Sequence, residues 1–153
     1  MTAPRIVEGS AADVERIMPV MHAAFDPRFG EAWNAAQCLG MLAIPGSTLL
    51  IAETGAQLIG FALMRSIMVE SELLLIAIDP EYRRQGIGRR LLDASCDVAR
   101  ASGAQTIFLE VRDSNDAIAL YGRVGFVQVG RRARYYRGID GAFFDALTFR
   151  RDL

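Results

Sequence analysis

Glu110 places a carboxylate inside an otherwise apolar stretch, Ile107-Phe108-Leu109-Glu110-Val111, near the C-terminal end of an expected strand. A charged side chain in such a strand is uncommon unless it is paired or takes part in chemistry. One interpretation is a general base, which removes a proton from an attacking group. The other is an ion pair, either with Arg112, two residues further along the same side, or with another arginine.

Tyr121 follows in a helix expected over residues 115–124, and its phenol could serve as the matching general acid. The commoner role of a helical tyrosine is structural, with the ring packed and the hydroxyl satisfied by a hydrogen bond.

The turn between residues 79 and 88 combines glycines with arginines directly before a helix. The free N–H groups and the dipole of a helix start attract anions, and Gly86 and Gly88 permit close backbone approach. Arg83, Arg84 and Arg89 add positive charge, so the turn suits a pyrophosphate. A P-loop is excluded because it needs a lysine, and a Rossmann fingerprint fails because Leu91 stands at its third glycine. An ordinary strand-to-helix turn with solvated arginines stays open as the alternative.

The elements that must position these residues follow from apolar periodicity and turn residues. Strands are expected at 5–8, 48–53, 58–65, 72–78, 106–111, 126–136 and 143–150. Helices are expected from Ser10 to Pro27 and at 31–42, 86–101 and 115–124. Hairpins followed by a strand–helix–strand unit predict an α/β (α+β) fold with a mixed sheet and helices on both faces. The apolar run at 73–78 favours burial on both faces of its strand.

Composition narrows the class of protein further. The 153 residues suit one domain, 1–153, and 52% of them are hydrophobic. The longest apolar run has six residues, far short of the roughly 20 that cross a membrane. Residues 1–5 lack a signal sequence, so we expect a cytoplasmic protein with Cys38 and Cys96 reduced in its core. These thiols and the single His22 have no zinc-site spacing, so no metal is expected.

The charge is balanced, with a net value of −1, and all seventeen basic residues are arginine. Without lysine, Schiff-base and pyridoxal-phosphate chemistry is excluded. The near-neutral net charge disfavours direct binding of nucleic acid. The arginine cluster at 131–137 is therefore interpreted as an exposed strand whose Tyr135 and Tyr136 line an acceptor site.

An ordered set of motifs resembles the GNAT acyltransferases. Arg83-x-x-Gly86-x-Gly88 is similar to the [Q/R]xxGxG/A motif of that family. As in the family, this motif follows a strand that ends in an apolar triplet, here Ile76-Ala77-Ile78. The second half of the family pattern resembles Leu109-Glu110-Val111-Arg112, Asn115, Ala119-Leu120-Tyr121 and Gly125-Phe126. The C-terminal end, with Arg131-Arg132, Tyr135-Tyr136 and Asp145-Ala146-Leu147, resembles the ribosomal-protein-alanine N-acetyltransferase branch.

The resemblance implies a GNAT fold, a mostly antiparallel sheet that splays apart where acetyl-CoA, the cosubstrate, binds. Its pyrophosphate would lie on the turn, and its pantetheine would pair with the apolar triplet like an added strand. The implied cofactor-binding residues are Ile76, Ala77, Ile78, Arg83, Arg84, Gln85, Gly86, Ile87, Gly88, Arg89 and Asn115.

The resemblance also implies that Glu110 is the base and Tyr121 the acid that protonates the departing thiolate. A phenol of pKa about 10 would protonate a thiolate of about 8.5 at a cost of roughly 2 kcal/mol, so it must lie near the sulfur. Asn115 to Tyr121 spans six residues where the family has seven. Either Ser114 or Asn115 therefore contacts the cofactor.

Glu110 acting alone suits an α-amine, with a pKa of about 7.7–8.0, better than a lysine of about 10.4. The preferred acceptor is a protein N-terminus, such as that of a ribosomal protein. The alternatives are a small-molecule amine or lysine acetyltransferase and a non-catalytic acyl-CoA sensor. Glu70 and Glu72 could contact a cationic acceptor or supply a second base, or they are solvated residues at the strand start.

Overall fold

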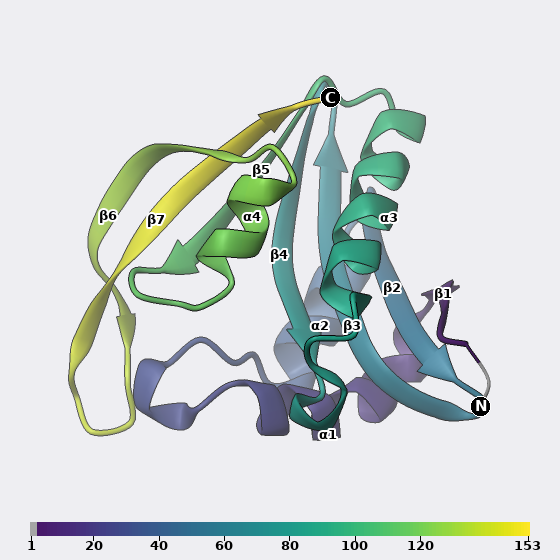
Figure 1. The fold of residues 1–153 in the computed structure, drawn as a ribbon, viewed down its shortest axis with the longest axis horizontal. Coiled ribbons are helices and arrows are strands. Elements are labelled where there is room, and N and C mark those ends of the chain that lie inside the picture. Colours follow the sequence, from purple (N-terminus) through teal and green to yellow (C-terminus); the bar gives the residue numbers. More distant parts are fainter. Residues whose placement is uncertain (1–2) are drawn as a thin grey trace.

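The computed structural model describes residues 3–153 and contains one seven-stranded sheet (Figure 1). Met1 and Thr2, on which part of the expectation about a signal sequence rests, lie outside the described residues. The strand order is β1-β2-β3-β4-β5-β7-β6, and among the described strands only β4 and β5 run parallel. The strands are β1 Arg5–Gly9, β2 Ser47–Thr54, β3 Gln57–Ile67, β4 Glu70–Ile78, β5 Thr106–Arg112, β6 Val127–Arg137 and β7 Phe143–Asp152.

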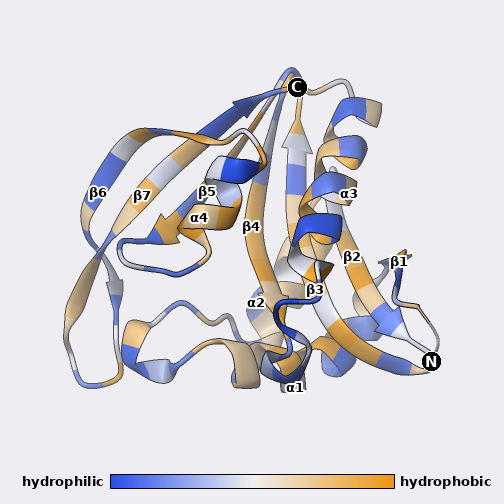
Figure 2. Ribbon diagram, viewed as in Figure 1, coloured by the Kyte–Doolittle hydropathy of each residue, from blue (hydrophilic) through white to orange (hydrophobic). Residues whose placement is uncertain are grey.

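Helices cover both faces of this sheet, as predicted. They are α1 Val14–Ala24, α2 Ala35–Leu42, α3 Ile87–Ala101 and α4 Ile118–Arg123, with short 3₁₀ turns η1 Ala11–Asp13, η2 Pro27–Phe29 and η3 Pro80–Tyr82. Two apolar clusters fill the spaces between the layers. One packs α3 and α4 against the sheet, and the other packs α1 and α2 against its opposite face. Figure 2 shows the basis of this packing: β4 is mostly hydrophobic, whereas α3 alternates between hydrophobic and hydrophilic residues.

Helix boundaries follow the capping residues more closely than the apolar periodicity. Ser10 forms the predicted capping box with Asp13, although it opens the turn η1 ahead of α1. The helix predicted at 31–42 begins only at Ala35, because Asn34 and Gln37 form a second capping box. The helix predicted at 115–124 is shorter, Ile118–Arg123. Residues 31–34 and 115–117 are therefore loops, and both loops carry side chains of the candidate site.

A bulge in β4 opens the sheet. Leu63 pairs with Leu75 and Met64 with Leu73, so Leu74 has no partner on β3. Pairing between β4 and β5 extends only from Glu70 and Thr106 to Leu73 and Leu109. Beyond that point the two strands separate, as the resemblance implied.

The prediction that this strand is buried on both faces is wrong for its second half. Leu75 and Ala77 are buried, but Leu74, Ile76 and Ile78 are only partly buried. The reason is the missing neighbour: past Leu73 no strand of the described chain pairs with this side of β4.

Candidate active site

The turn before α3 presents unpaired backbone N–H groups. Gly86 adopts φ 79° at the N-cap of α3, and no side chain caps this helix. The first backbone hydrogen bond of the helix runs from the N–H of Arg90 to the carbonyl of Gly86. The preceding N–H groups of the first turn therefore have no acceptor within the helix, which is the geometry of an anion site.

The arginines of this turn remain largely exposed. Arg83 donates from Nη2 to the carbonyl oxygen of Ala24, 3.3 Å away, and Arg89 pairs with Asp93 at 3.4 Å. Arg84 has a left-handed backbone, with φ 63°. A cluster of exposed guanidinium groups beside free N–H groups can bind a pyrophosphate without displacing a buried contact.

Gly88 lies where the turn, β4 and α4 come together. A Cβ atom at this position would stand 3.2 Å from Leu120 and 3.9 Å from Ile78. The second half of β4, with Ile76, Ala77 and Ile78, therefore runs past the start of α3 with its hydrogen-bonding edge free of a neighbouring strand.

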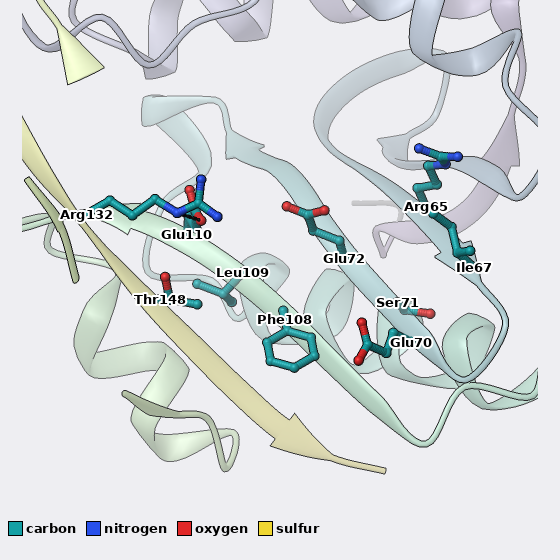
Figure 3. A pocket seen from close by; sticks show the side chains of 10 residues that line it. All are labelled: Arg65, Ile67, Glu70, Ser71, Glu72, Phe108, Leu109, Glu110, Arg132 and Thr148. Atoms are coloured by element: carbon teal, nitrogen blue, oxygen red, sulfur yellow. Dashed lines mark ion pairs between the residues drawn. The ribbon is translucent and has the colours of Figure 1, made fainter. Parts of the chain in front are cut away.

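Glu110 lines a cavity of about 280 Å³ on the sheet face opposite α3 (Figure 3). Its carboxylate pairs with Arg132 of β6, Nε to Oε1 2.9 Å. Its side chain is only 14% exposed, whereas that of Arg132 is 60% exposed. Arg112, the ion-pair partner first considered from the sequence, instead binds Glu31. The cavity is lined by Arg65, Ile67, Glu70, Ser71, Glu72, Phe108, Leu109, Glu110, Arg132 and Thr148.

Glu72 projects into the same cavity, between Arg65 and the Glu110–Arg132 pair in Figure 3. Desolvation by the cavity walls, and then the negative charge of Glu110, raise the pKa of the Glu72 carboxyl, although much of this side chain stays accessible. The cavity thus holds facing carboxylates whose combined charge favours a cation.

Tyr121 lies on the other face of the sheet, buried in the cluster that contains α3. Its ring contacts Phe126 edge to face at 6.1 Å and Phe149 at 6.2 Å. Burial first, and then the charge of Glu31, raise the pKa of the Tyr121 phenol well above its usual value. The phenol therefore holds its proton more tightly than an exposed tyrosine does. As a proton donor it is weaker than the ordinary value of about 10 implied.

The separation of β4 from β5 is where groups on the two faces can meet. Leu109 and Val111 of β5 pack on the α3 side, so Glu110 between them faces the other side. A molecule lying between the separated strands would have Tyr121 on one side and Glu110 on the other. Tyr136 adds to the Glu110 side, with its hydroxyl 3.5 Å from the backbone carbonyl of Glu110. Its predicted place at the acceptor site stays a prediction.

The loop before α4 is occupied by protein contacts. Asn115 donates from Nδ2 to Glu31, and its Oδ1 accepts from the N–H of Ala117. Ser114 adopts φ 76°, and its hydroxyl accepts from Arg112. Sequence reasoning missed Glu31, because it reaches Arg112 and Asn115 across 81 and 84 residues of the chain and stands in no motif. Arg132 was named in a motif, but the sequence did not identify it as the arginine that pairs with Glu110.

Three further observations concern possible metal ligands, membrane-spanning helices and the cysteines. Among residues 3–153, no group of three or more His, Cys, Asp or Glu side chains is placed to hold a metal ion. Over the same residues, no helix is both long and apolar enough to cross a membrane. Cys38 and Cys96 are buried free thiols, as predicted.

The splayed sheet, the uncapped glycine turn and the carboxylate opposite a tyrosine are the features expected of the acyltransferases that the sequence resembles. Comparison with known proteins identifies the same family. The model of the acetyltransferase (GNAT) family matches residues 15–126, and the chain belongs to this family of N-acetyltransferases. Its members use acetyl-CoA as the acetyl donor.

Three relatives place the chain more closely within the family. The N-alpha-acetyltransferase RimI of Mycobacterium tuberculosis is 44% identical over 80% of this chain and 77% of its own length. The [ribosomal protein bS18]-alanine N-acetyltransferase of Escherichia coli K12 is 45% identical over 53% of this chain, and the match spans 55% of that enzyme. The crystal structure of the ribosomal-protein-S18-alanine N-acetyltransferase from Escherichia coli superposes with a TM-score of 0.86, at 29% identity over 98% of this chain and 94% of that one.

Proposed function

We propose that this protein transfers the acetyl group of acetyl-CoA to the N-terminal α-amine of a protein, with a ribosomal protein as the preferred acceptor. The observation that carries the proposal is the position of Glu110, a nearly buried carboxylate beside the point where β4 and β5 separate. The names of the relatives, two of which act on a ribosomal protein alanine, support the choice of acceptor. The reaction would take place in the cytoplasm, with no part for a membrane, a nucleic acid or a metal.

In the proposed reaction, the acid and the base lie on opposite faces of the sheet. The N–H groups of the turn at 84–89 and the edge of β4 at 76–78 would hold acetyl-CoA, with Asn115 or Ser114 near it. Glu110 would accept a proton from the acceptor ammonium, directly or through water, so that the amine can attack the thioester carbonyl. As the new N–C bond forms and the C–S bond breaks, Tyr121 would donate its hydroxyl proton to the departing sulfur. The second proton that the nitrogen loses on becoming an amide would return through water to the Tyr121 phenolate, and the proton on Glu110 would be released to solvent.

The proton balance favours an α-amine over a lysine. Deprotonating a lysine side chain is harder by about 2.5 pKa units, or roughly 3.4 kcal/mol. The carboxylates that line the cavity, Glu72 and Glu110, also suit an acceptor that arrives as an ammonium ion.

Two matched peptides test the proposal by release of CoA and by mass spectrometry of the product. One peptide has a free N-terminal alanine and no lysine, and the other has a blocked N-terminus and one lysine. We expect acetylation of the first alone. Acetylation of the second would assign the protein to lysine acetylation instead. Acetyl-CoA binding without acetylation of either would point to a small amine or to a sensor.

The same assay tests the base. We expect Glu110→Gln to lower the rate on the alanine peptide by at least about 100-fold, because the amide cannot accept the proton. Acetyl-CoA affinity, measured by calorimetry, should be unchanged, since the turn before α3 is untouched. Unchanged turnover in this variant would remove Glu110 from the mechanism.

A further inference from the structure

Glu31 is a buried carboxylate far along the chain from the catalytic motifs. It lies in the loop between α1 and α2, and its side chain is 9% exposed. Its Oε1 accepts from Nε of Arg112 at 3.1 Å, and its Oε2 accepts from Nδ2 of Asn115 at 3.2 Å. Each carboxylate oxygen therefore has a partner in the segment that joins β5 to α4.

Arg112 has several protein partners besides Glu31, and these restrict the orientation of its guanidinium. Its side chain is 11% exposed, and its guanidinium lies over the ring of Phe29 at 3.6 Å from the centroid. Nη1 also donates to the hydroxyl of Ser114 at 3.1 Å. A guanidinium that is stacked on a ring loses little further freedom on pairing with a carboxylate, because its fork is already oriented.

Asn115 connects Glu31 to the start of α4. While Nδ2 binds Glu31, Oδ1 accepts from the N–H of Ala117 at 2.8 Å, one residue before the helix begins. The backbone N–H of Ile118 donates to the carbonyl of Asn115. Tyr121 lies one turn further along this six-residue helix. The position and orientation of its ring therefore depend on the position of Asn115.

The same contacts join the two faces of the sheet. Glu31 and Phe29 belong to the loop on the Glu110 side, whereas α4 packs on the α3 side. Burial first, and then the negative charge of Glu31, raise the pKa of the phenols of Tyr121 and Tyr136.

We propose that Glu31 is a positioning residue, which through Arg112 and Asn115 fixes the segment 112–117 and so places the Tyr121 hydroxyl for proton transfer. This inference rests on the proposed function, in which Tyr121 is the acid. Asn115 is one residue closer to Tyr121 than the family pattern has it. The contact with Glu31, which lies outside the helix, would keep the start of α4 in place despite this shorter spacing.

A double-mutant cycle tests the inference through the kcat for acetylation of the alanine peptide. We expect Glu31→Gln, which keeps the shape but removes the charge and one acceptor oxygen, to lower kcat by about 10-fold or more. We expect Tyr121→Phe to lower kcat as well. In the Tyr121→Phe background, Glu31→Gln should cause little further loss, because residues that act as a unit are not additive. The KM for acetyl-CoA should change less than kcat does, because the turn before α3, the larger part of the proposed cofactor site, is untouched.

The control is Asp26→Asn, which makes the same charge change in the same loop at an exposed residue. The Asp26 side chain binds Arg28 and contacts none of Glu31, Arg112 and Asn115, and the Asn amide oxygen can still accept from the N–H of Arg28. This substitution should leave kcat unchanged. If Glu31→Gln lowers kcat equally with and without the Tyr121 hydroxyl, or not at all, the positioning role is wrong while the proposed function stands. If Tyr121→Phe leaves kcat unchanged, the acid of the proposed function is wrong, and the role of Glu31 falls with it.

Glu31→Gln leaves Arg112 buried without a counter-charge, so its fold must be verified by circular dichroism. Should it fail to fold, the pair Glu31→Leu with Arg112→Met removes both charges and also removes the acceptor for Asn115. The same non-additivity with Tyr121→Phe is expected of that pair, and an additive loss would overturn the inference.

Discussion

At the scale of single residues, Glu110 has an ion-pair partner that is easily displaced. Arg132 is 60% exposed, and ion pairs with such a residue contribute about 0–1 kcal/mol. An acceptor ammonium can therefore replace the guanidinium on the carboxylate at little energetic cost. Tyr121, in contrast, is buried among Phe126 and Phe149 and has no such freedom.

Glu72 links this cavity to the pH dependence of stability. Its pKa is raised in the folded protein, so folding disfavours its ionised form. The stability that the protonated carboxyl contributes is present below the unfolded-state pKa of about 4.3 and is lost as pH rises through the higher folded value.

We therefore expect Glu72→Gln, which mimics the protonated form, to unfold at higher urea concentration than the wild type at pH 7.5. The difference should shrink as pH falls toward about 4, where the wild-type carboxyl is itself protonated. Urea denaturation curves of both proteins between these pH values measure it. A difference that grows toward acid pH would contradict the raised pKa.

At the scale of elements, the bulge at Leu74 and the glycine turn before α3 act together. The bulge ends the pairing of β4 with β5, and the turn places free N–H groups at the start of α3. Gly86 and Gly103 stand on either side of α3 with φ of 79° and 93°, and a Cβ at either position would meet nothing within 4 Å.

Substitutions of these two glycines distinguish the effect of backbone strain on stability from the effect of the turn on cofactor binding. Gly86→Ala and Gly103→Ala should each destabilise the protein by about 1–2 kcal/mol, because both force alanine into a left-handed conformation. Only Gly86→Ala should weaken acetyl-CoA binding, since only its turn carries the proposed anion site. Urea denaturation and calorimetric titration with acetyl-CoA measure the two effects. Equal acetyl-CoA affinity in the two variants would exclude this turn as the pyrophosphate site.

At the scale of the whole molecule, the α1–α2 loop is packed against the β6–β7 hairpin, more than 100 residues later. The N–H of Ile139 donates to the carbonyl of Pro27 at 3.1 Å, and Phe29 contacts Phe144 edge to face at 5.1 Å. A Cβ at Gly30, where φ is 69°, would stand 1.9 Å from the backbone oxygen of Arg137. This packing holds Glu31 in place on the Glu110 side of the sheet.

Gly30→Ala should therefore separate the loop from the hairpin. We expect a loss of about 2–3 kcal/mol in the free energy of unfolding, from strain and overpacking together, and a higher KM for the acceptor peptide. Gly141→Ala is the matched control, because that glycine has φ 86° and open space around it. It should cost only the strain, about 1–2 kcal/mol, and leave KM unchanged. Equal effects of the two substitutions would show that the contact with Arg137 is unimportant.

The amino-acid sequence by itself determined the features that depend on local pattern. The order of strands and helices, the glycine turn at Gly86 and the N-cap at Ser10 all follow from neighbouring residues, whose propensities act without long-range contacts. Glu110 and Tyr121 stood out because each breaks or completes a short motif. Their catalytic roles stay predictions for the variants described above.

Only the tertiary structure decided which side chains meet. Arg112 was the first ion-pair partner considered for Glu110, yet Arg132 of β6 takes that place and Arg112 binds Glu31, 81 residues away. The unpaired Leu74 was equally invisible, since the run 73–78 is uniformly apolar and only its register with β3 reveals the bulge. Contacts between distant segments depend on how sheet and loops pack together, and periodicity within a single segment carries no information about them.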